Sequence, residues 1–327
     1  MSKQMHISRR GFLQGGSAIT AASCLMAGLA KADTFPSQTI NFIVPDSGGG
    51  SFDAYVRKFS QLMEPYLKPS VNVEPLTIPG AGGQAAVFNL LHDQPDGYNI
   101  GMVNVPGLFT AQYDKKRKPL DLASLTWVAN LGRESYGVAV SSKSSIHNIA
   151  DLRKLSQTRK LSFSSTGFGS TDYFATRVFN EALGLNFRQV LGYTGSSPTM
   201  IAVARGDVDA VVHSLATLQA MERSGLIRII FVFQESNSIP GIDNSASIGK
   251  PELNEIYQWR PVAAPPSVPQ DIIKILSDAL IAAAKTPDAA TWAKTAGTTL
   301  YPLDYEAALG MIKTQEALVA KWKFVLT

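Results

Sequence analysis

The sequence predicts an α/β protein with mainly parallel sheets, and three observations support this fold class. Short apolar runs rich in β-branched residues alternate with stretches of helical periodicity along most of the chain. Glycine, serine, proline or asparagine marks most changes from one pattern to the other. Four glycine-rich loops follow predicted strands, and a chain of 327 residues is long enough for two domains.

Eight runs are predicted to be strands, because each is short, apolar and bounded by turn residues. The first of them reads INFIV and precedes a run of three glycines. The predicted strands are residues 40–44, 71–76, 99–103, 136–140, 161–164, 188–191, 208–212 and 227–233.

The first helix is predicted to begin near Ser51, because apolar residues recur after it at three- and four-residue spacing. Such a stripe packs one side of a helix on a sheet. Its members are Phe52, Tyr55, Val56, Phe59, Leu62, Met63 and Tyr66.

Later helices are predicted from their end signals. The helix after loop 164–171 ends at Gly184, a residue that favours a left-handed cap. Ser197 and Pro198 indicate an N-cap followed by the first helical residue, and Gly206 ends that helix. The C-terminal part is predicted to be mostly helical, with long helices at residues 272–285 and 305–323.

Residues 1–32 are predicted to be an export signal that is removed from the mature protein. The segment reads SRRGFLQ from Ser8, which resembles the twin-arginine signature, and Ala-Lys-Ala at residues 30–32 supplies a cleavage site. An uncleaved membrane anchor is the alternative, but glycines and polar residues interrupt the apolar run. Lipidation of Cys24 is a second alternative, because residues 21–24 read AASC.

Charge and composition narrow the classes of function. The formal net charge of +4 equals the charge of the four basic residues in the signal, so the mature chain is neutral. The charge therefore gives no indication of binding to nucleic acid or to an anionic membrane. The basic run 115–118 is interpreted as a solvated loop. The only cysteine lies in the signal, and the three dispersed histidines of the mature chain do not predict a zinc site. No cofactor, metal or catalytic residue is predicted.

Four loops at strand-to-helix junctions have an unusual composition. They cover residues 45–53, 78–84, 164–171 and 192–198. In open α/β sheets, the carboxyl ends of the strands form the ligand crevice, and the N–H groups that begin each helix attract anions. The loops lack both the G-x-G-x-x-G spacing of dinucleotide sites and the Gly-Lys-Ser/Thr of a P-loop. We therefore expect them to bind a carboxylate.

Six segments carry a resemblance to a known family. They read IVPDSGGGSFD, PGAGGQAA, QPDGYNIGM, STGFGSTDY, GYTGSSPTMIAVARGDVDAVV and PPSVPQDIIKILSDAL. In this order, they resemble the substrate-binding proteins of tripartite tricarboxylate transporters, the Bug receptors. The resemblance implies a two-lobed type II periplasmic-binding-protein fold with a ligand cleft between the lobes. It also implies a monomer that delivers a small carboxylate to membrane permease subunits in the periplasm.

The predicted lobes and ligand-binding residues follow from the loops and the resemblance. Lobe 1 is predicted at residues 33–135 plus 235–327, and lobe 2 at residues 136–234. A receptor that reports to a signalling partner and, less favoured, a cleft enzyme stay open as alternatives. The predicted ligand-binding residues are Ser47, Gly49, Gly50, Ser51, Asp53, Gly82, Gly83, Gln84, Asn104, Ser165, Thr166, Gly169, Ser170, Thr171, Tyr193, Asp209 and His213.

The sequence departs from the family pattern in several places, among them Asp46 and His213. Asp46 stands where the family often has proline, and its carboxylate is expected either to point away from an anion or to receive an amine of the ligand. His213 stands where the family commonly has an acid. We expect its imidazole to reach the cleft, the alternative being a histidine that faces the core or caps the next helix.

Overall fold

The computed structural model describes residues 35–114, 120–236 and 239–326. The predicted export signal at residues 1–32, with Cys24 inside it, and the basic run 115–118 lie outside the described residues. In the part of the chain that is described, no helix has both the length and the apolar character needed to cross a bilayer.

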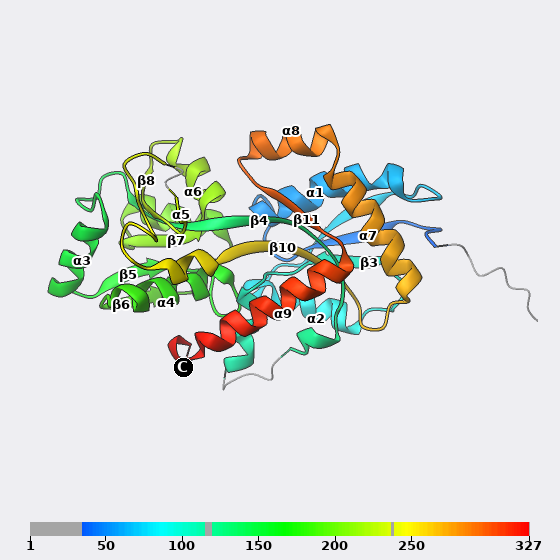
Figure 1. Cartoon of the computed structure of the whole chain (residues 1–327), viewed down its shortest axis with the longest axis horizontal. Coiled ribbons are helices and arrows are strands. Elements are labelled where there is room, and N and C mark those ends of the chain that lie inside the picture. The colour runs from blue at the N-terminus through cyan, green and yellow to red at the C-terminus, as the bar shows by residue number, and fades with distance from the viewer. Residues whose placement is uncertain (1–34, 115–119, 237–238, 327) are drawn as a thin grey trace, which may run out of the picture.

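The strands form one sheet with the central order β2-β1-β3-β10-β4-β7-β5-β6, and β8, β9 and β11 join it beside this path. Figure 1 shows β4 and β10 running lengthwise through the molecule. The strands are β1 Ile40–Val44, β2 Val73–Thr77, β3 Asn99–Met102, β4 Thr126–Ser141, β5 Leu161–Ser164, β6 Phe187–Val190, β7 Ala210–Ser214, β8 Ile227–Val232, β9 Asp243–Asn244, β10 Tyr257–Ala264 and β11 Leu300–Leu303.

The same strand order occurs in two lobes. The first lobe has the order β2-β1-β3-β10-β4, and the second has β6-β5-β7-β4-β8. Within each lobe, the strands that begin the order pair in parallel. The antiparallel pairs described all involve β4 or β10. The predicted α/β class with a two-lobed type II fold is therefore confirmed.

Strand β4 belongs to both lobes. Its residues up to Ser135 pair with β10, and its residues from Tyr136 pair with β7 and β8. The predicted boundary between residues 135 and 136 thus falls inside one continuous strand. The residue limits of the lobes stay a prediction.

Helices cover both sides of the sheet. In the first lobe, α1 and α7 pack on one face around a shared apolar core, and α2 and α9 belong to the core on the other face. In the second lobe, α5 and α6 pack on β7 and β8, opposite α4. The helices are α1 Ser51–Met63, α2 Gln84–His92, α3 Ile149–Thr158, α4 Thr171–Leu183, α5 Ser196–Arg205, α6 Leu215–Glu222, α7 Gln270–Ala284, α8 Pro287–Ala296 and α9 Tyr305–Lys321.

The predicted apolar stripe of α1 is mostly buried. Phe52, Tyr55, Val56, Phe59 and Met63 all lie in the core of the first lobe. Tyr66 does not, because the helix gives way after Met63 to a short 3-10 turn that leaves this ring 42% exposed.

Some predicted element ends were wrong. Helix α5 begins at Ser196 with Gly195 as its N-cap, so Pro198 is the third helical residue. Proline fits there because the first N–H groups of a helix have no partner within it. Strand β7 begins at Ala210 and ends at Ser214, both two residues later than predicted, and therefore includes His213. Strand β10 was not predicted.

A fully buried ion pair joins β4, the strand shared by the lobes, to its neighbour β10. Arg260 of β10 donates from Nη2 to Oε2 of Glu134 on β4 at 3.0 Å, and both side chains are almost completely inaccessible. The same Nη2 donates to the hydroxyl of Ser51, the first residue of α1, at 2.9 Å. The guanidinium also packs over the ring of Phe52, 4.4 Å from its centroid.

Replacing Glu134 by Gln should therefore destabilise the protein severely. The substitution keeps the shape of the side chain but leaves the charge of Arg260 buried without a counterion. Breaking a buried pair from one side costs about 3–5 kcal/mol. The matched control is Glu255→Gln, which removes the exposed ion pair with Lys321 and should cost less than about 1 kcal/mol. Urea unfolding measures both, and equal losses would contradict this role for the buried pair.

Candidate functional site

A cavity of about 400 Å³ lies between the loops of the two lobes. Its walls come from the four glycine-rich loops and the helix starts that follow them, from the segment after β3, from the crossing strands β4 and β10, and from β7. The lining residues are Pro45, Asp46, Ser51, Phe52, Pro79, Gly80, Ala81, Gly82, Gly83, Asn104, Tyr136, Thr166, Asp172, Gly192, Tyr193, Thr194, Gly195, Ser196, His213 and Gln258.

The direction of the strands explains why these loops meet. The parallel strands β1, β2 and β3 present their carboxyl ends at one edge of the first lobe. Strands β5, β6 and β7 do the same in the second lobe. The helices that follow β1, β5 and β6 begin at Ser51, Thr171 and Ser196, so their first turns lie beside the cavity.

Two of these helix starts have free N–H groups. The N-caps of α1 and α5 are Gly50 and Gly195, and no described side chain caps either helix. Helix α4 differs, because the hydroxyl of Ser170 accepts a hydrogen bond from the N–H of Tyr173. The first N–H groups of a helix carry a partial positive charge and bind anions. Helices α1 and α5 therefore direct anion-binding groups at the cavity from opposite lobes.

The two lobes approach each other closely beside the cavity. A side chain at Gly107 would place its first carbon 2.2 Å from the backbone carbon of Ser170, so only glycine fits there. The N–H of Gly107 instead donates to the hydroxyl of Thr171 at 3.0 Å. The same hydroxyl lies 2.7 Å from Oδ1 of Asn104, which accepts its proton.

Other hydrogen bonds connect the lobes around the same cavity. The hydroxyl of Ser47 donates to the carbonyl of Thr194 at 2.9 Å, and the amide of Gln84 donates to the carbonyl of Phe168 at 3.2 Å. These two predicted residues thus hold loops of opposite lobes together.

Seven of the predicted residues line the cavity. The loops of the first lobe supply four of them and those of the second lobe supply two, while His213 comes from β7. Gly49 and Gly50 line a neighbouring cavity instead. The seven residues are Ser51, Gly82, Gly83, Asn104, Thr166, Tyr193 and His213.

Four predicted residues of the third loop lie behind the cavity wall and shape it. The hydroxyl of Ser165 accepts from the N–H of Gly167, and that of Ser170 donates to the carbonyl of Gly167. The N–H of Gly169 donates across the lobes to Thr110, and Thr171 binds Asn104 as described. Hydrogen bonds within the protein occupy these groups.

Two predicted acids do not line the cavity. Asp53 accepts from the N–H of Gly49 at 2.9 Å and pairs with Arg57, so it fixes the first glycine loop from behind. Asp209 was misplaced: it precedes β7 and lies at the amino end of this strand, away from the cavity. Although burial alone would raise the pKa of Asp209, hydrogen bonds from Arg159 and Ser162 lower it.

His213 lies inside β7 and is 93% buried, with its ring 6.3 Å from that of Tyr136. Its Nδ1 accepts from the N–H of Ser214 at 2.8 Å, which leaves Nε2 to carry the proton of the neutral ring. Burial lowers the pKa of His213, Asp172 opposes this effect, and Arg260 adds to it.

The sequence did not predict several lining residues. The hydroxyl of Tyr136 donates to Gln258 at 2.8 Å, and the amide of Gln258 lies 3.3 Å from Oδ1 of Asn104. Asp172 accepts from both the N–H and the hydroxyl of Thr166. Asp172 directly follows a predicted loop, so it could have been found, whereas Gln258 lies on a strand that was not predicted.

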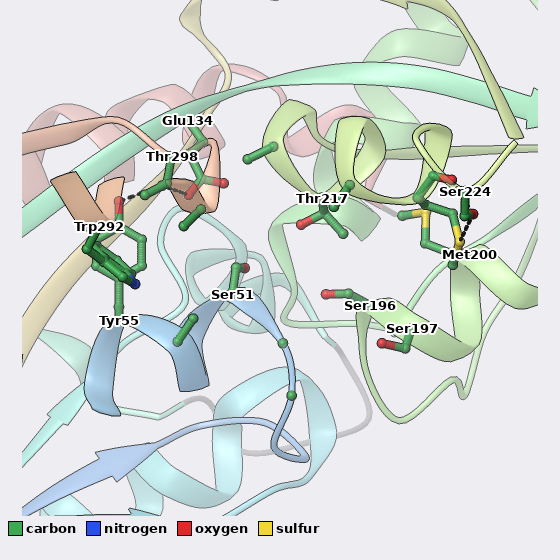
Figure 2. A pocket seen from close by; sticks show the side chains of 17 residues that line it. Ser51, Tyr55, Glu134, Ser196, Ser197, Met200, Thr217, Ser224, Trp292 and Thr298 are labelled. Carbon is green, nitrogen blue, oxygen red and sulfur yellow. Dashed lines mark hydrogen bonds between the residues drawn. The ribbon is translucent and has the colours of Figure 1, made fainter. Parts of the chain in front are cut away.

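A second cavity of about 390 Å³ adjoins the first and shares Ser51 and Ser196 with it. Figure 2 shows Tyr55 and Trp292 on one side of this cavity and Met200 on the other. In the described residues, no group of three or more side chains is arranged to hold a metal ion.

Two lobes of the same topology, with a ligand-sized cavity between their loops, define the class of periplasmic-binding-protein-like solute receptors. Residues 56–326 match the family described as Tripartite tricarboxylate transporter family receptor. The chain belongs to this family.

Known proteins resemble the chain over most of its length. A UPF0065 protein of Bordetella pertussis is 26% identical over 272 residues, which cover 82% of this chain and 83% of the relative. The solved periplasmic binding protein BugD has a TM-score of 0.78 and 22% identity, covering 89% of this chain and 98% of its own. MatC from Rhodopseudomonas palustris, solved with bound malate, has a TM-score of 0.78 and 21% identity, covering 90% and 100%.

Replacing Thr171 by Val should destabilise the contact between the lobes. The buried N–H of Gly107 would lose its acceptor, and Asn104 would lose a donor. An unsatisfied buried polar group costs about 1–3 kcal/mol. The control Thr314→Val removes an exposed hydroxyl that donates within α9 and should change stability by less than about 0.5 kcal/mol. Urea unfolding measures both variants, and an unchanged midpoint for Thr171→Val would contradict this role.

Proposed function

We propose that this protein is an extracytoplasmic solute receptor that closes on a small organic carboxylate and delivers it to a membrane permease. One observation carries the proposal: the uncapped N-termini of α1 and α5 approach a single cavity from opposite lobes. A bound anion would contact both helices, and its binding energy would hold the lobes together.

Related proteins support the ligand class. MatC was solved with malate, and another Rhodopseudomonas palustris protein of the same fold was solved with adipate. Both ligands are small carboxylates, and the present cavity has hydroxyl, amide and backbone donors of the kind that bind such groups.

The partner and the cellular location are part of the same proposal. Membership of the receptor family supports delivery to tripartite permease subunits, and the predicted signal supports export to the periplasm by the twin-arginine route. Co-purification with membrane subunits would separate a transport receptor from one that reports to a signalling protein. Recovery of the ligand unchanged after long incubation would separate a receptor from an enzyme.

The ligand class can be tested directly. Native mass spectrometry of the purified protein, followed by thermal-shift screening of dicarboxylates, tricarboxylates and aromatic acids, should reveal stabilisation by at least one carboxylate. If no carboxylate stabilises the protein while another class of solute does, the proposal is wrong.

The variant Gly83→Val should weaken binding of the best carboxylate from this screen about 10- to 100-fold. Gly83 has φ +98° and lines the cavity, so a valine side chain would enter the space beside Pro45 and Asn104. Each hydrogen bond to a charged ligand contributes about 1.5–3 kcal/mol. Gly206→Val is the matched control, because Gly206 has φ +82° but does not line the cavity. Isothermal titration should find normal affinity in the control, and equal weakening in both variants would point to backbone strain.

Affinity for a plain carboxylate should increase as pH falls, in part through His213. In the free protein, burial lowers the pKa of this imidazole, and the groups that face it are Asp172, Arg260 and Glu134. A bound anion would raise that pKa. The contribution of protonated His213 to ligand affinity is therefore complete below the pKa of His213 in the free protein. It is lost as pH rises through the pKa of His213 in the complex.

Titration calorimetry at about pH 5.5 and 8 compares the wild type with His213→Gln, with the exposed His147→Gln as control. The wild type and the control should show a larger gain at low pH than His213→Gln. If all three proteins show the same pH dependence, His213 does not sense the ligand.

A further inference from the structure

Asp46 places a carboxylate with an unpaired oxygen at the cavity. The residue lines the cavity two positions after β1, and its Oδ2 lies only 2.9 Å from the point where a side chain at Gly50 would begin. The absence of a side chain at Gly50 thus allows the carboxylate to lie under the first glycine loop. Among the described residues, its Oδ1 is buried without a hydrogen-bond partner.

The other charged groups near the cavity do not neutralise Asp46. Both oxygens of Asp172 are occupied by Thr166, and no lysine or arginine is among the described lining residues. Arg260 lies behind the wall, where it is paired with Glu134. Arg260 therefore faces the carboxylates of Asp46, Asp172 and Glu134, whereas Asp53 is paired with Arg57. Burial lowers the pKa of His213, so its imidazole does not offset this charge at neutral pH. The surroundings of the cavity carry an excess of negative charge.

The burial of Asp46 has a measurable consequence. Loss of solvent raises its pKa to about 6, Arg260 lowers the pKa in part, and Asp53 raises it further. A carboxylate in such a place is stabilised by any cation that reaches it. None of the described residues that line the cavity is a lysine or an arginine, so we expect a bound ligand to supply the cation.

We propose that the cavity binds a carboxylate that also carries an ammonium group, and that Asp46 receives this ammonium. The inference rests on the proposed function, in which the N-termini of α1 and α5 hold the ligand carboxylate. A zwitterion adds no net charge to an already acidic cavity. A dicarboxylate would add two negative charges beside Asp46 and Asp172. Asp46 is then the residue that determines specificity between amino acids and plain carboxylic acids.

Matched ligand pairs test the proposal. Succinate and aspartate differ by one ammonium group, as do propionate and β-alanine, and isothermal titration can measure each at about pH 7.5, above the pKa of Asp46. The wild type should bind the ammonium-bearing member of at least one pair about 10- to 100-fold more tightly, the effect of one charged hydrogen bond. In Asp46→Asn, this preference should vanish and affinity for the plain member should be unchanged or higher.

Asp93→Asn is the matched control. Asp93 also has a buried oxygen without a described partner and a pKa that burial raises. It follows the C-terminal end of α2, however, about 13 Å of helix away from the glycine loop at the other end. This control should keep the wild-type preference, and thermal unfolding should show that both variants are folded.

The outcomes distinguish this inference from the proposed function. If plain carboxylates bind as tightly as their ammonium-bearing partners, or if Asp46→Asn keeps the preference, the role of Asp46 is overturned and the receptor function stands. If Asp46→Asn keeps the preference, the carboxylate of Asp46 only offsets the charge of Arg260 and does not contact the ammonium group of the ligand. If no carboxylate of either kind binds, both the function and the inference fail.

The pH dependence provides a second readout, measured in the His213→Gln background to remove the imidazole. An ammonium group stabilises the ionised form of Asp46 and lowers its pKa in the complex. Affinity for an amino acid should therefore be lost below the pKa of the complex and be complete above about 6. A plain carboxylate raises the same pKa, so its affinity should fall as pH rises through this range. Slopes of the same sign for both ligands would contradict the proposal.

Discussion

The buried pair of Arg260 and Glu134 is the interaction on which the arrangement of the lobes and the cavity depends. Each partner lies on one of the two strands that connect the lobes, so the pair fixes β10 against β4 at the crossing. The guanidinium also holds Ser51, and with it the start of α1. Two further nitrogens of Arg260 have no described partner, so the charge is held mainly by Glu134 and by packing on aromatic rings.

The ion pair also fixes one side of the site. The glycine loop before α1 has no capping side chain, yet its end is fixed through Ser51 to the crossing strands. Hydrogen bonds such as the one between Thr171 and Asn104 connect the loops of the second lobe to the first lobe beside the cavity. Apolar packing joins the lobes as well, because Leu108 and Phe109 of the first lobe belong to the same buried cluster as Tyr173 and Phe174 of the second. The contact between the lobes beside the cavity therefore combines buried apolar packing with hydrogen bonds.

Sequence patterns predicted the parts of the fold that are local in the chain. The unit formed by β1, its glycine loop and α1 was found because strand, loop and helix follow one another directly. Strand β10 was not found, because its partners β3 and β4 lie more than a hundred residues earlier and its polar residues Gln258 and Arg260 disguise a buried strand. Asp209 shows a related limit. A shift of two residues in the start of β7 moves this residue from the second position of the predicted strand to the position before the strand, at the end opposite the ligand edge.

The alternation of side chains along the crossing strands connects the ion pair to the cavity. Glu134 and Tyr136 are two residues apart on β4, and Gln258 and Arg260 are two apart on β10, so each couple shares one face of the sheet. Glu134 is directly opposite Gln258 in the register. Tyr136 binds Gln258 at the floor of the cavity, and Arg260 binds Glu134 one step away. Tyr136 and Gln258, which a ligand in the cavity would contact, therefore lie on the two strands that connect the lobes. A ligand bound to these two residues would act directly on the strands about which the lobes would move.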